Sequence, residues 1–172
     1  MPETSQVQPS APVPTLFDVI ARIESSNWQA ALRFEPTIYA KFSNVAYSQV
    51  HVDQINAIAK INRCSRQTAE VIFSTSWGAT QIMGFNLYGV CDWKAPFISF
   101  LNDETAQRVC FNAFCANQKL LFSPQQLADD WTKRELFAKR YNGSINYLGP
   151  LCDALRATGF KVVSQAEAVA QK

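Results

Sequence analysis

The sequence has little histidine and little charge, and it lacks a long uninterrupted apolar run. The only histidine is His51, to which we assign no role, and the five cysteines form no CxxC pair, so a zinc site would need scattered ligands. Charged residues make up 17% of the chain and the net charge is +2, far from the basic stripe of a nucleic-acid binder. The composition therefore argues against a zinc site and against a nucleic-acid partner.

Two further absences concern membranes and export. Residues 71–91 carry no charge, but hydroxyl, amide and glycine residues interrupt them too often for a transmembrane helix. Residues 1–14 lack the basic start and apolar centre of a signal peptide and are rich in Pro, Ser and Gln. We therefore expect a soluble protein with a disordered Pro-rich leader over residues 1–14 and no stable membrane insertion.

The cysteines are odd in number in a chain without a recognisable export signal. This favours thiols that pack as small apolar side chains. Cys110 and Cys115 lie five residues apart on an expected helix and point in different directions, so they are poor partners. The sequence leaves open whether any cysteines pair in an oxidising space.

Helical signals cover most of the remaining chain. Thr15 and Asp18 form a variant capping box that opens a helix ending near Ser25 or Ser26, and a second strong start lies at Ser123. The helix or pair of helices that starts at Ser123 is expected to run to about residue 140. Further helices are expected at about 35–42, 52–61, 65–73, 103–120 and 148–157. By contrast, residues 74–86 mix glycine, hydroxyls and aromatics without a helical period, which predicts turns or a hairpin.

These elements predict one mainly α domain over residues 15–162. It contains a short irregular or β-hairpin segment around residues 74–90, and a polar tail follows at 163–172. A chain of this length buries roughly two thirds of its unfolded surface, so one apolar core suffices. Many functions share such an architecture, so the function must be sought in the motifs.

The first motif is IESSNW, residues 23–28. Glu24 falls near the end of the first helix, where the negative end of the helix dipole disfavours another negative charge. Apolar neighbours such as Trp28 or Phe34 would desolvate the carboxyl, and both effects raise its pKa as a general acid requires. Taken alone, however, a glutamate in a last helical turn is more often an ordinary surface residue.

Two further motifs are SWGATQIMG, residues 76–84, and FAKRYNG, residues 137–143. Gly78 allows backbone to approach a ligand closely, Gln81 can hydrogen-bond a sugar, and Tyr141 can place a hydroxyl in a site. Considered separately, the first motif fits a buried loop equally well. The Asn142-Gly143 pair is an ordinary helix stop.

Together, the order and spacing of the three motifs resemble the lysozyme-like superfamily, which includes goose-type lysozymes and soluble lytic transglycosylases. The chain is most similar to phage N-acetylmuramidases, with LRFEP at 32–36 and QIMGFN at 81–86 as shared phrases. The resemblance spans about residues 15–158. It implies a lysozyme-like helical domain that cleaves the β-1,4 bond between N-acetylmuramic acid and N-acetylglucosamine.

The resemblance also implies roles for individual residues. Glu24 is the acid that protonates the glycosidic oxygen, and Tyr141 orients Glu24 or the substrate. The other residues that it places at the site are Gly78 and Gln81 on the floor of the sugar groove, and Ser25 and Ser76 as supporting hydrogen-bonders. One departure is GATQ at residues 78–81, where transglycosylases usually have Gly-Leu-Met-Gln, which makes the wall near the acid smaller and more polar.

Aromatic residues cluster around the motifs, and their faces suit the apolar patches of sugar rings. The members of this cluster are Trp28, Trp77, Tyr88, Trp93 and Tyr147. From this cluster we expect Trp77 and Tyr88 to line the groove, and we add Asn142 to the substrate-binding residues.

A hydrolase usually needs a second carboxylate to activate water. Glu35 is the candidate, although its place just before Pro36 also suits a helix N-terminus, and Asp92 is a weaker alternative. Without such a group, the muramic acid 6-hydroxyl attacks instead and leaves a 1,6-anhydro end, as in lytic transglycosylases. A different class of function is a non-catalytic structural module on the same scaffold.

The implied partner is the peptidoglycan glycan strand, with no cofactor and no metal ion, and we expect a monomer. The absence of a recognisable signal peptide predicts an endolysin that stays in the host cytoplasm before lysis. It would reach the periplasm or cell wall through a holin, or it would be carried in the phage particle.

Overall fold

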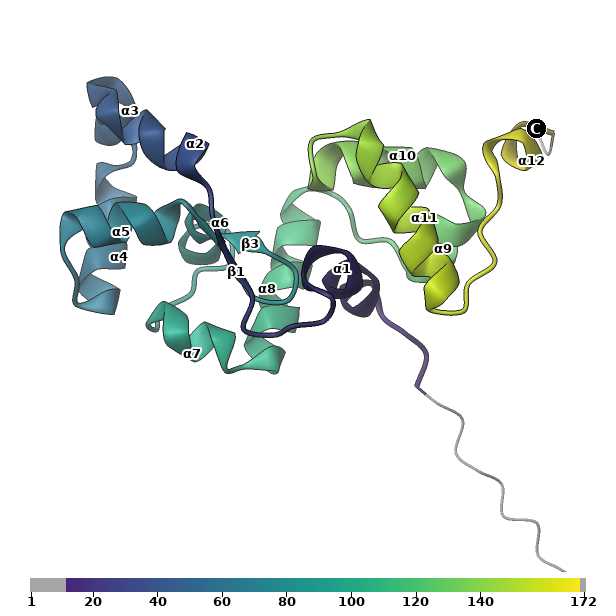
Figure 1. The fold of residues 1–172 in the computed structure, drawn as a ribbon, viewed down its shortest axis with the longest axis horizontal. Helices are drawn as coiled ribbons and strands as arrows, with labels where there is room; N and C mark the ends of the chain where they lie inside the picture. Colours follow the sequence, from purple (N-terminus) through teal and green to yellow (C-terminus); the bar gives the residue numbers. More distant parts are fainter. Residues whose placement is uncertain (1–11, 171–172) are drawn as a thin grey trace, which may run out of the picture.

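The computed structural model describes residues 12–170, so most of the leader expected over residues 1–14 lies outside the described residues. The fold is mainly α with one small antiparallel sheet, as predicted (Figure 1). The first half contains α1 (Leu16–Ser25), β1 (Leu32–Phe34), α2 (Pro36–Tyr39), α3 (Val45–Val50), α4 (Val52–Asn62), α5 (Arg66–Phe73), β2 (Thr75–Trp77), β3 (Ile82–Met83) and α6 (Gly84–Tyr88). The second half contains α7 (Phe97–Leu101), α8 (Glu104–Asn117), α9 (Pro124–Asp129), α10 (Trp131–Tyr141), α11 (Leu148–Ala157) and α12 (Gln165–Ala170).

Two 3-10 helices complete the list, at Ala40–Ser43 and Ile145–Tyr147. None of the helices within residues 12–170 is both long and apolar enough to cross a membrane.

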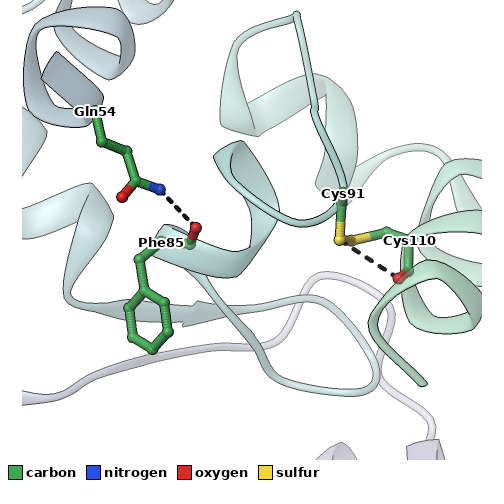
Figure 2. The surroundings of a disulfide bond; sticks show 4 residues. All are labelled: Gln54, Phe85, Cys91 and Cys110. Carbon is green, nitrogen blue, oxygen red and sulfur yellow. Dashed lines mark hydrogen bonds between the residues drawn. A yellow bond between two sulfur atoms is a disulfide. The ribbon is translucent and has the colours of Figure 1, made fainter. Parts of the chain in front are cut away.

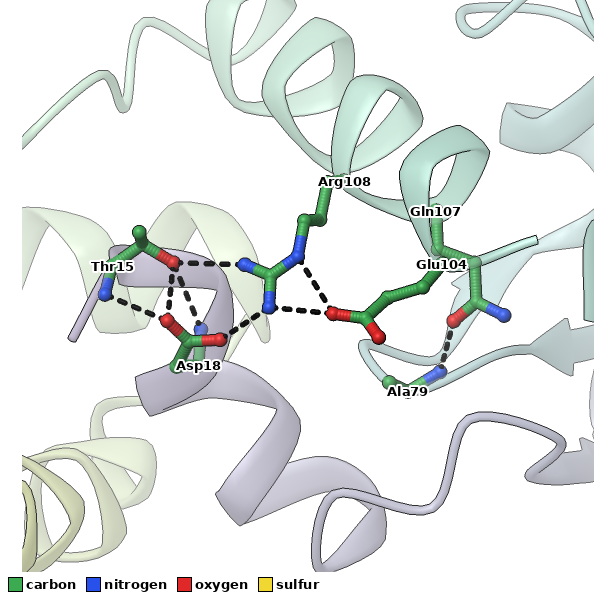
Figure 3. Close-up of polar contacts among 6 residues, drawn as sticks. All are labelled: Thr15, Asp18, Ala79, Glu104, Gln107 and Arg108. Carbon is green, nitrogen blue, oxygen red and sulfur yellow. Dashed lines mark hydrogen bonds and ion pairs between the residues drawn. The ribbon is translucent and has the colours of Figure 1, made fainter. Parts of the chain in front are cut away.

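Local capping fixes several helix starts where the sequence predicts them. The Thr15 side chain accepts from the Asp18 N–H while the Asp18 carboxylate accepts from the Thr15 N–H, which forms a full capping box on α1. Ser123 and Gln126 form another on α9. Arg108 of α8 donates to Asp18 at 2.7 Å and to Glu104 at 2.7 Å, and so holds the start of α1 against α8 (Figure 3).

The sheet has the strand order β1-β2-β3, with both pairs antiparallel. Its register places Arg33 opposite Ser76 and Ser76 opposite Met83. Since side chains of one cross-strand row point to the same face, these three share one face of the sheet. The sequence pattern indicates β2 and β3 as part of a hairpin segment but gives no sign of β1, because all three residues of β1 are exposed and show no alternation.

The elements form two groups with the sheet between them (Figure 1). Helices α2 to α5 lie at one end and α9 to α12 at the other, while α1, α7, α8 and the sheet occupy the middle. One apolar core runs through both groups, from Ile55 of α4 through Ile20 of α1 and Phe111 of α8 to Leu151 of α11. The sheet therefore lies between helices that come from distant parts of the sequence.

The sequence favours thiols and leaves cysteine pairing open, and the structure pairs two of the five cysteines. Cys91, in the segment after α6, forms a disulfide with Cys110 of α8, and their Cα atoms are 4.9 Å apart (Figure 2). The two cysteines are 19 residues apart in sequence, and tertiary folding brings them together. Gln54 of α4 donates to the carbonyl of Phe85 at 2.6 Å, so α6 is tied to α4 as well.

The C-terminal segment is fixed to the second group of helices by Arg134. This side chain is fully buried and donates to the carbonyls of Leu127 and Ala128 at the end of α9 and to that of Val163. The backbone N–H of Val163 in turn donates to Ala128 at 2.9 Å. Three backbone carbonyls, two of them near the C-terminus of α9, thus compensate the charge of this buried guanidinium.

Candidate active site

A cavity of about 190 Å³ lies where α1, the sheet and α10 meet. Its lining residues are Glu24, Arg33, Ser76, Thr80, Gln81, Ile82, Met83, Asn86, Phe114, Tyr141 and Asn142. The three sequence motifs therefore each contribute to one cavity. We call the α1 and α10 side, with Glu24 and Tyr141, the helical wall, and the Arg33, Ser76 and Met83 row the sheet wall.

Glu24 lies in the last turn of α1, and its carboxyl Oε1 accepts a hydrogen bond from the Tyr147 hydroxyl at 2.7 Å. Burial desolvates the carboxyl and raises the pKa of Glu24 above its ordinary value. The Tyr147 hydrogen bond and the positive charge of Arg33 act in the opposite direction but do not cancel the effect of burial. A carboxyl in this state is suited to hold a proton that it can deliver.

The desolvating groups differ from those predicted. Trp28 is 65% exposed and Phe34 is 42% exposed, so neither shields the carboxyl as expected. The aromatic groups near Glu24 are instead Tyr147 and Tyr141, whose ring centroids lie 5.8 Å apart. Helix α1 ends at Ser25, the C-cap Ser26 has a left-handed backbone conformation, and Trp28 follows in an exposed position.

Tyr141 is predicted to orient Glu24 or the substrate, but the hydrogen bond to Glu24 comes from Tyr147, so only the contact with the substrate stays a prediction for Tyr141. Tyr141 lines the cavity, but its hydroxyl donates to the carbonyl of Thr80 at 2.8 Å and so connects α10 to the turn between β2 and β3. Burial raises the pKa of both tyrosines, so their hydroxyls remain hydrogen-bond donors at neutral pH. Tyr147 was recognised in the sequence as part of an aromatic cluster, but nothing there distinguished it from core aromatics.

The sheet wall brings Glu35 beside the cavity. The Arg33 Nε–H donates to Glu35 Oε1 at 2.6 Å, and Ser76 Oγ lies 3.5 Å from the same oxygen. Glu35 occupies the N-cap position of α2, yet its side chain makes no capping hydrogen bond. The carboxylate is thus turned toward two cavity-lining residues, whereas the other candidate, Asp92, pairs with Lys94 in a loop with 71% of its side chain exposed.

The two aromatic residues predicted to line the groove lie away from the cavity lining. Trp77 is 5% exposed; its indole N–H donates to the carbonyl of Ile72 at 3.0 Å. Because Ser76 faces the cavity, the next residue along β2 must face the opposite side. Tyr88 is buried and hydrogen-bonded to Asn62, and burial raises its pKa to about 12. The prediction that these two aromatics line the groove is therefore wrong.

Gly78 serves packing in this structure. It has a φ of +77°, and a Cβ there would lie 2.7 Å from the Gln107 side-chain oxygen. Gln107 is buried; its Oε1 accepts from the Ala79 N–H at 2.8 Å (Figure 3), and its Nε2 donates to the carbonyl of Gln29 at 3.0 Å. This amide therefore joins the β2–β3 turn to the segment between α1 and β1.

The remaining predicted residues are distributed as follows. Ser76, Gln81 and Asn142 line the cavity, and the Gln81 Nε2 donates to the Gly78 carbonyl at 3.0 Å, which leaves its Oε1 for a ligand. Ser25 does not line it, and its hydroxyl donates to the carbonyl of Ala21. Within residues 12–170 no group of three or more His, Cys, Asp or Glu side chains is arranged to hold a metal ion.

Comparisons with known proteins identify the family of this chain. Residues 19–149 match the Muramidase family, described as N-acetylmuramidase. The endolysin of Enterobacteria phage PRD1 is 37% identical over 148 residues, which cover 86% of this chain and 98% of that relative. The search of solved structures finds no match. The chain therefore belongs to the N-acetylmuramidase family of peptidoglycan hydrolases.

Proposed function

We propose that this protein is a phage endolysin that hydrolyses the β-1,4 bond between N-acetylmuramic acid and N-acetylglucosamine, with Glu24 as the general acid. The observation that carries the proposal is the Glu24 carboxyl, which lines the cavity, is desolvated, and accepts only a neutral phenol hydrogen bond among the described contacts. The family match and the phage relative support the substrate and the setting.

In the proposed reaction, Glu24 transfers its proton to the glycosidic oxygen as the bond to C1 of the muramoyl residue breaks. The N-acetylglucosamine residue leaves with a free 4-hydroxyl. Burial raises the pKa of Glu24 and so favours the protonated form that donates, and cleavage leaves a carboxylate that takes up a proton again before the next turnover. The Tyr147 hydroxyl holds the carboxyl in one orientation and stabilises the charge that forms on it.

Glu35 is the proposed base. A water molecule attacks C1 and gives its proton to the Glu35 carboxylate, which adjoins the sheet wall through Arg33 and Ser76. Inverting glycosidases place their two carboxyl groups about 6.5–9.5 Å apart so that the water fits between them. The product then carries a reducing N-acetylmuramic acid end.

One observation favours a second reaction, the formation of a 1,6-anhydro end. Glu35 is not itself among the residues that line the cavity, although two of its contacts are. If Glu35 does not activate water, the muramoyl 6-hydroxyl is the nucleophile and the product carries a 1,6-anhydro end.

The experiment that tests the proposal uses purified bacterial cell walls. The wild-type protein is expected to clear them and to release reducing N-acetylmuramic acid ends, and Glu24→Gln is expected to lose about 10³-fold in rate because its amide cannot donate the catalytic proton. Glu135→Gln is the matched control, since Glu135 pairs with Lys139 on α10 and does not line the cavity. Equal clearing by wild type and a folded Glu24→Gln variant would refute the role of Glu24. Anhydro ends would refute hydrolysis.

A further inference from the structure

We propose that Arg33 forms an anion-binding subsite that recognises a carboxylate carried by the muramoyl residue of the substrate. The inference rests on the proposed function and adds to it the group that distinguishes peptidoglycan from a neutral glycan. Arg33 lines the same cavity as Glu24 and is close enough for its charge to lower the pKa of that carboxyl.

The guanidinium of Arg33 has donors to spare. A guanidinium carries five N–H groups, and in the described part of the chain only the Arg33 Nε–H has a protein acceptor, Glu35 Oε1 at 2.6 Å. The side chain is 62% exposed, so the two Nη groups are open to solvent and ligand. One edge of the fork is thus occupied, and the other is free.

The hydrogen bond from the Arg33 Nε–H to Glu35 restrains the direction in which the two Nη groups point. Arg33 is held in β1 by its register with Ser76, and its contact with Glu35 restrains the end of a long side chain. Two parallel N–H groups on a guanidinium match the two oxygens of a carboxylate, which makes this pairing geometrically specific. A restrained arginine also loses less conformational freedom on binding than a free one.

The chemistry of the substrate explains why a cation belongs there. N-acetylglucosamine carries no charge, whereas muramic acid carries a lactyl ether with a carboxyl group, which is either free or joined to a stem peptide with carboxylates of its own. Arg33 is the one cationic side chain among the described residues that line the cavity. A neutral sugar needs no such partner, so the cation favours the muramoyl side of the strand.

Calorimetric binding to uncleaved ligands tests the subsite in a Glu24→Gln background. The probes are tetra-N-acetylchitotetraose, which is neutral, a peptide-free tetrasaccharide of alternating N-acetylglucosamine and N-acetylmuramic acid, and the same tetrasaccharide with stem peptides. We expect Arg33→Gln to weaken binding of an anionic probe by about 10- to 100-fold, as for a lost hydrogen bond to a charged group. Binding of the neutral probe should change less than about twofold.

The two anionic probes identify the source of the carboxylate. Loss of affinity for the peptide-free tetrasaccharide assigns it to the lactyl group, and loss confined to the peptide-bearing probe assigns it to the stem peptide. Arg33→Lys should recover part of the affinity, because it keeps the charge and loses the fork. Arg22→Gln is the matched control, since Arg22 is an exposed arginine of α1 that does not line this cavity.

Two results would overturn the inference: equal weakening of all three probes by Arg33→Gln, or no weakening of any. In an otherwise wild-type chain, Arg33→Gln should also raise KM on intact peptidoglycan, whereas Arg22→Gln should leave this KM unchanged. If wild type releases muropeptides but Arg33→Gln does not weaken binding of the anionic probes selectively, the subsite is rejected and the proposed function stands. If wild type releases none, the proposed function fails.

Discussion

The two carboxyl groups proposed for catalysis have contrasting surroundings. Glu24 on the helical wall is desolvated and accepts a hydrogen bond from a neutral tyrosine, whereas Glu35 beside the sheet wall contacts a guanidinium and a serine hydroxyl. Two glutamates can take different acid–base roles when one is desolvated and the other contacts a cation and a hydroxyl. The two walls come from different elements, so the proposed role of each glutamate can be tested by altering one wall at a time.

The largest effect expected from the sheet wall is that of Glu35→Gln. Loss of the base should lower kcat by about 100-fold, since positioned general acid–base groups contribute about 10²- to 10⁴-fold. The measurement is the rate of reducing-end release from purified walls, with Glu104→Gln as a control because Glu104 lies on α8 away from this cavity. A Glu35→Gln variant with wild-type kcat would place the nucleophile elsewhere and favour substrate-assisted formation of anhydro ends.

Gln107→Met tests whether the sheet wall depends on one buried amide. The change removes the acceptor of the Ala79 N–H and the donor to the Gln29 carbonyl, leaving buried polar groups without partners. We expect the free energy of unfolding to fall by about 2–3 kcal/mol, measured by urea denaturation. Gln125→Met, at an exposed position of α9, is the control. A loss within about 0.5 kcal/mol for Gln107→Met would show that the turn holds its shape without the amide.

Tyr147→Phe alters the helical wall without removing the acid. The Tyr147 hydrogen bond lowers the pKa of Glu24, so its loss should raise that pKa further. Because the acid acts in its protonated form, the alkaline limb of the kcat–pH profile should move to higher pH, with a loss in kcat within about 10-fold. An alkaline limb that moves to lower pH, or does not move, would contradict this assignment. Tyr39→Phe is the control, since Tyr39 does not line the cavity.

The smallest expected effect concerns stability. A carboxyl whose pKa is raised in the folded state is stabilised in its protonated form, so its contribution is favourable at low pH and is lost as pH rises through the folded pKa. Wild type should therefore lose stability relative to Glu24→Gln between the unfolded pKa of a glutamate and the raised pKa of Glu24. Thermal unfolding of both proteins across this range measures the difference. A wild-type stability that rises relative to that of Glu24→Gln as pH rises would have the wrong sign.

The sequence predicts those parts of the molecule that short-range patterns determine. The capping boxes at Thr15 and Ser123 act within four residues, and α11 has the bounds expected from its apolar spacing and the following Gly159. Glu24 could be selected because its motif combines a helix end with neighbouring motifs at family spacing. These features need no knowledge of which distant segments meet.

The parts that sequence reasoning missed depend on contacts between distant segments. Strand β1 forms only through pairing with β2, and its exposed residues show no pattern of their own. Tyr147 reaches Glu24 across 123 positions, and the Cys91–Cys110 disulfide also depends on tertiary folding. Trp77 was misplaced for a different reason, because assigning Ser76 to the cavity already requires its neighbour in a strand to face away.

The most direct test of the account is the titration of the Glu24 carboxyl itself. Carbon-13 NMR of glutamate-labelled protein resolves the carboxyl signals, and the signal missing from Glu24→Gln identifies Glu24. We predict a midpoint above the ordinary value of 4.5, coinciding with the alkaline limb of the kcat–pH profile. A midpoint at or below 4.5 would contradict the raised pKa on which the role of Glu24 as the proton donor rests.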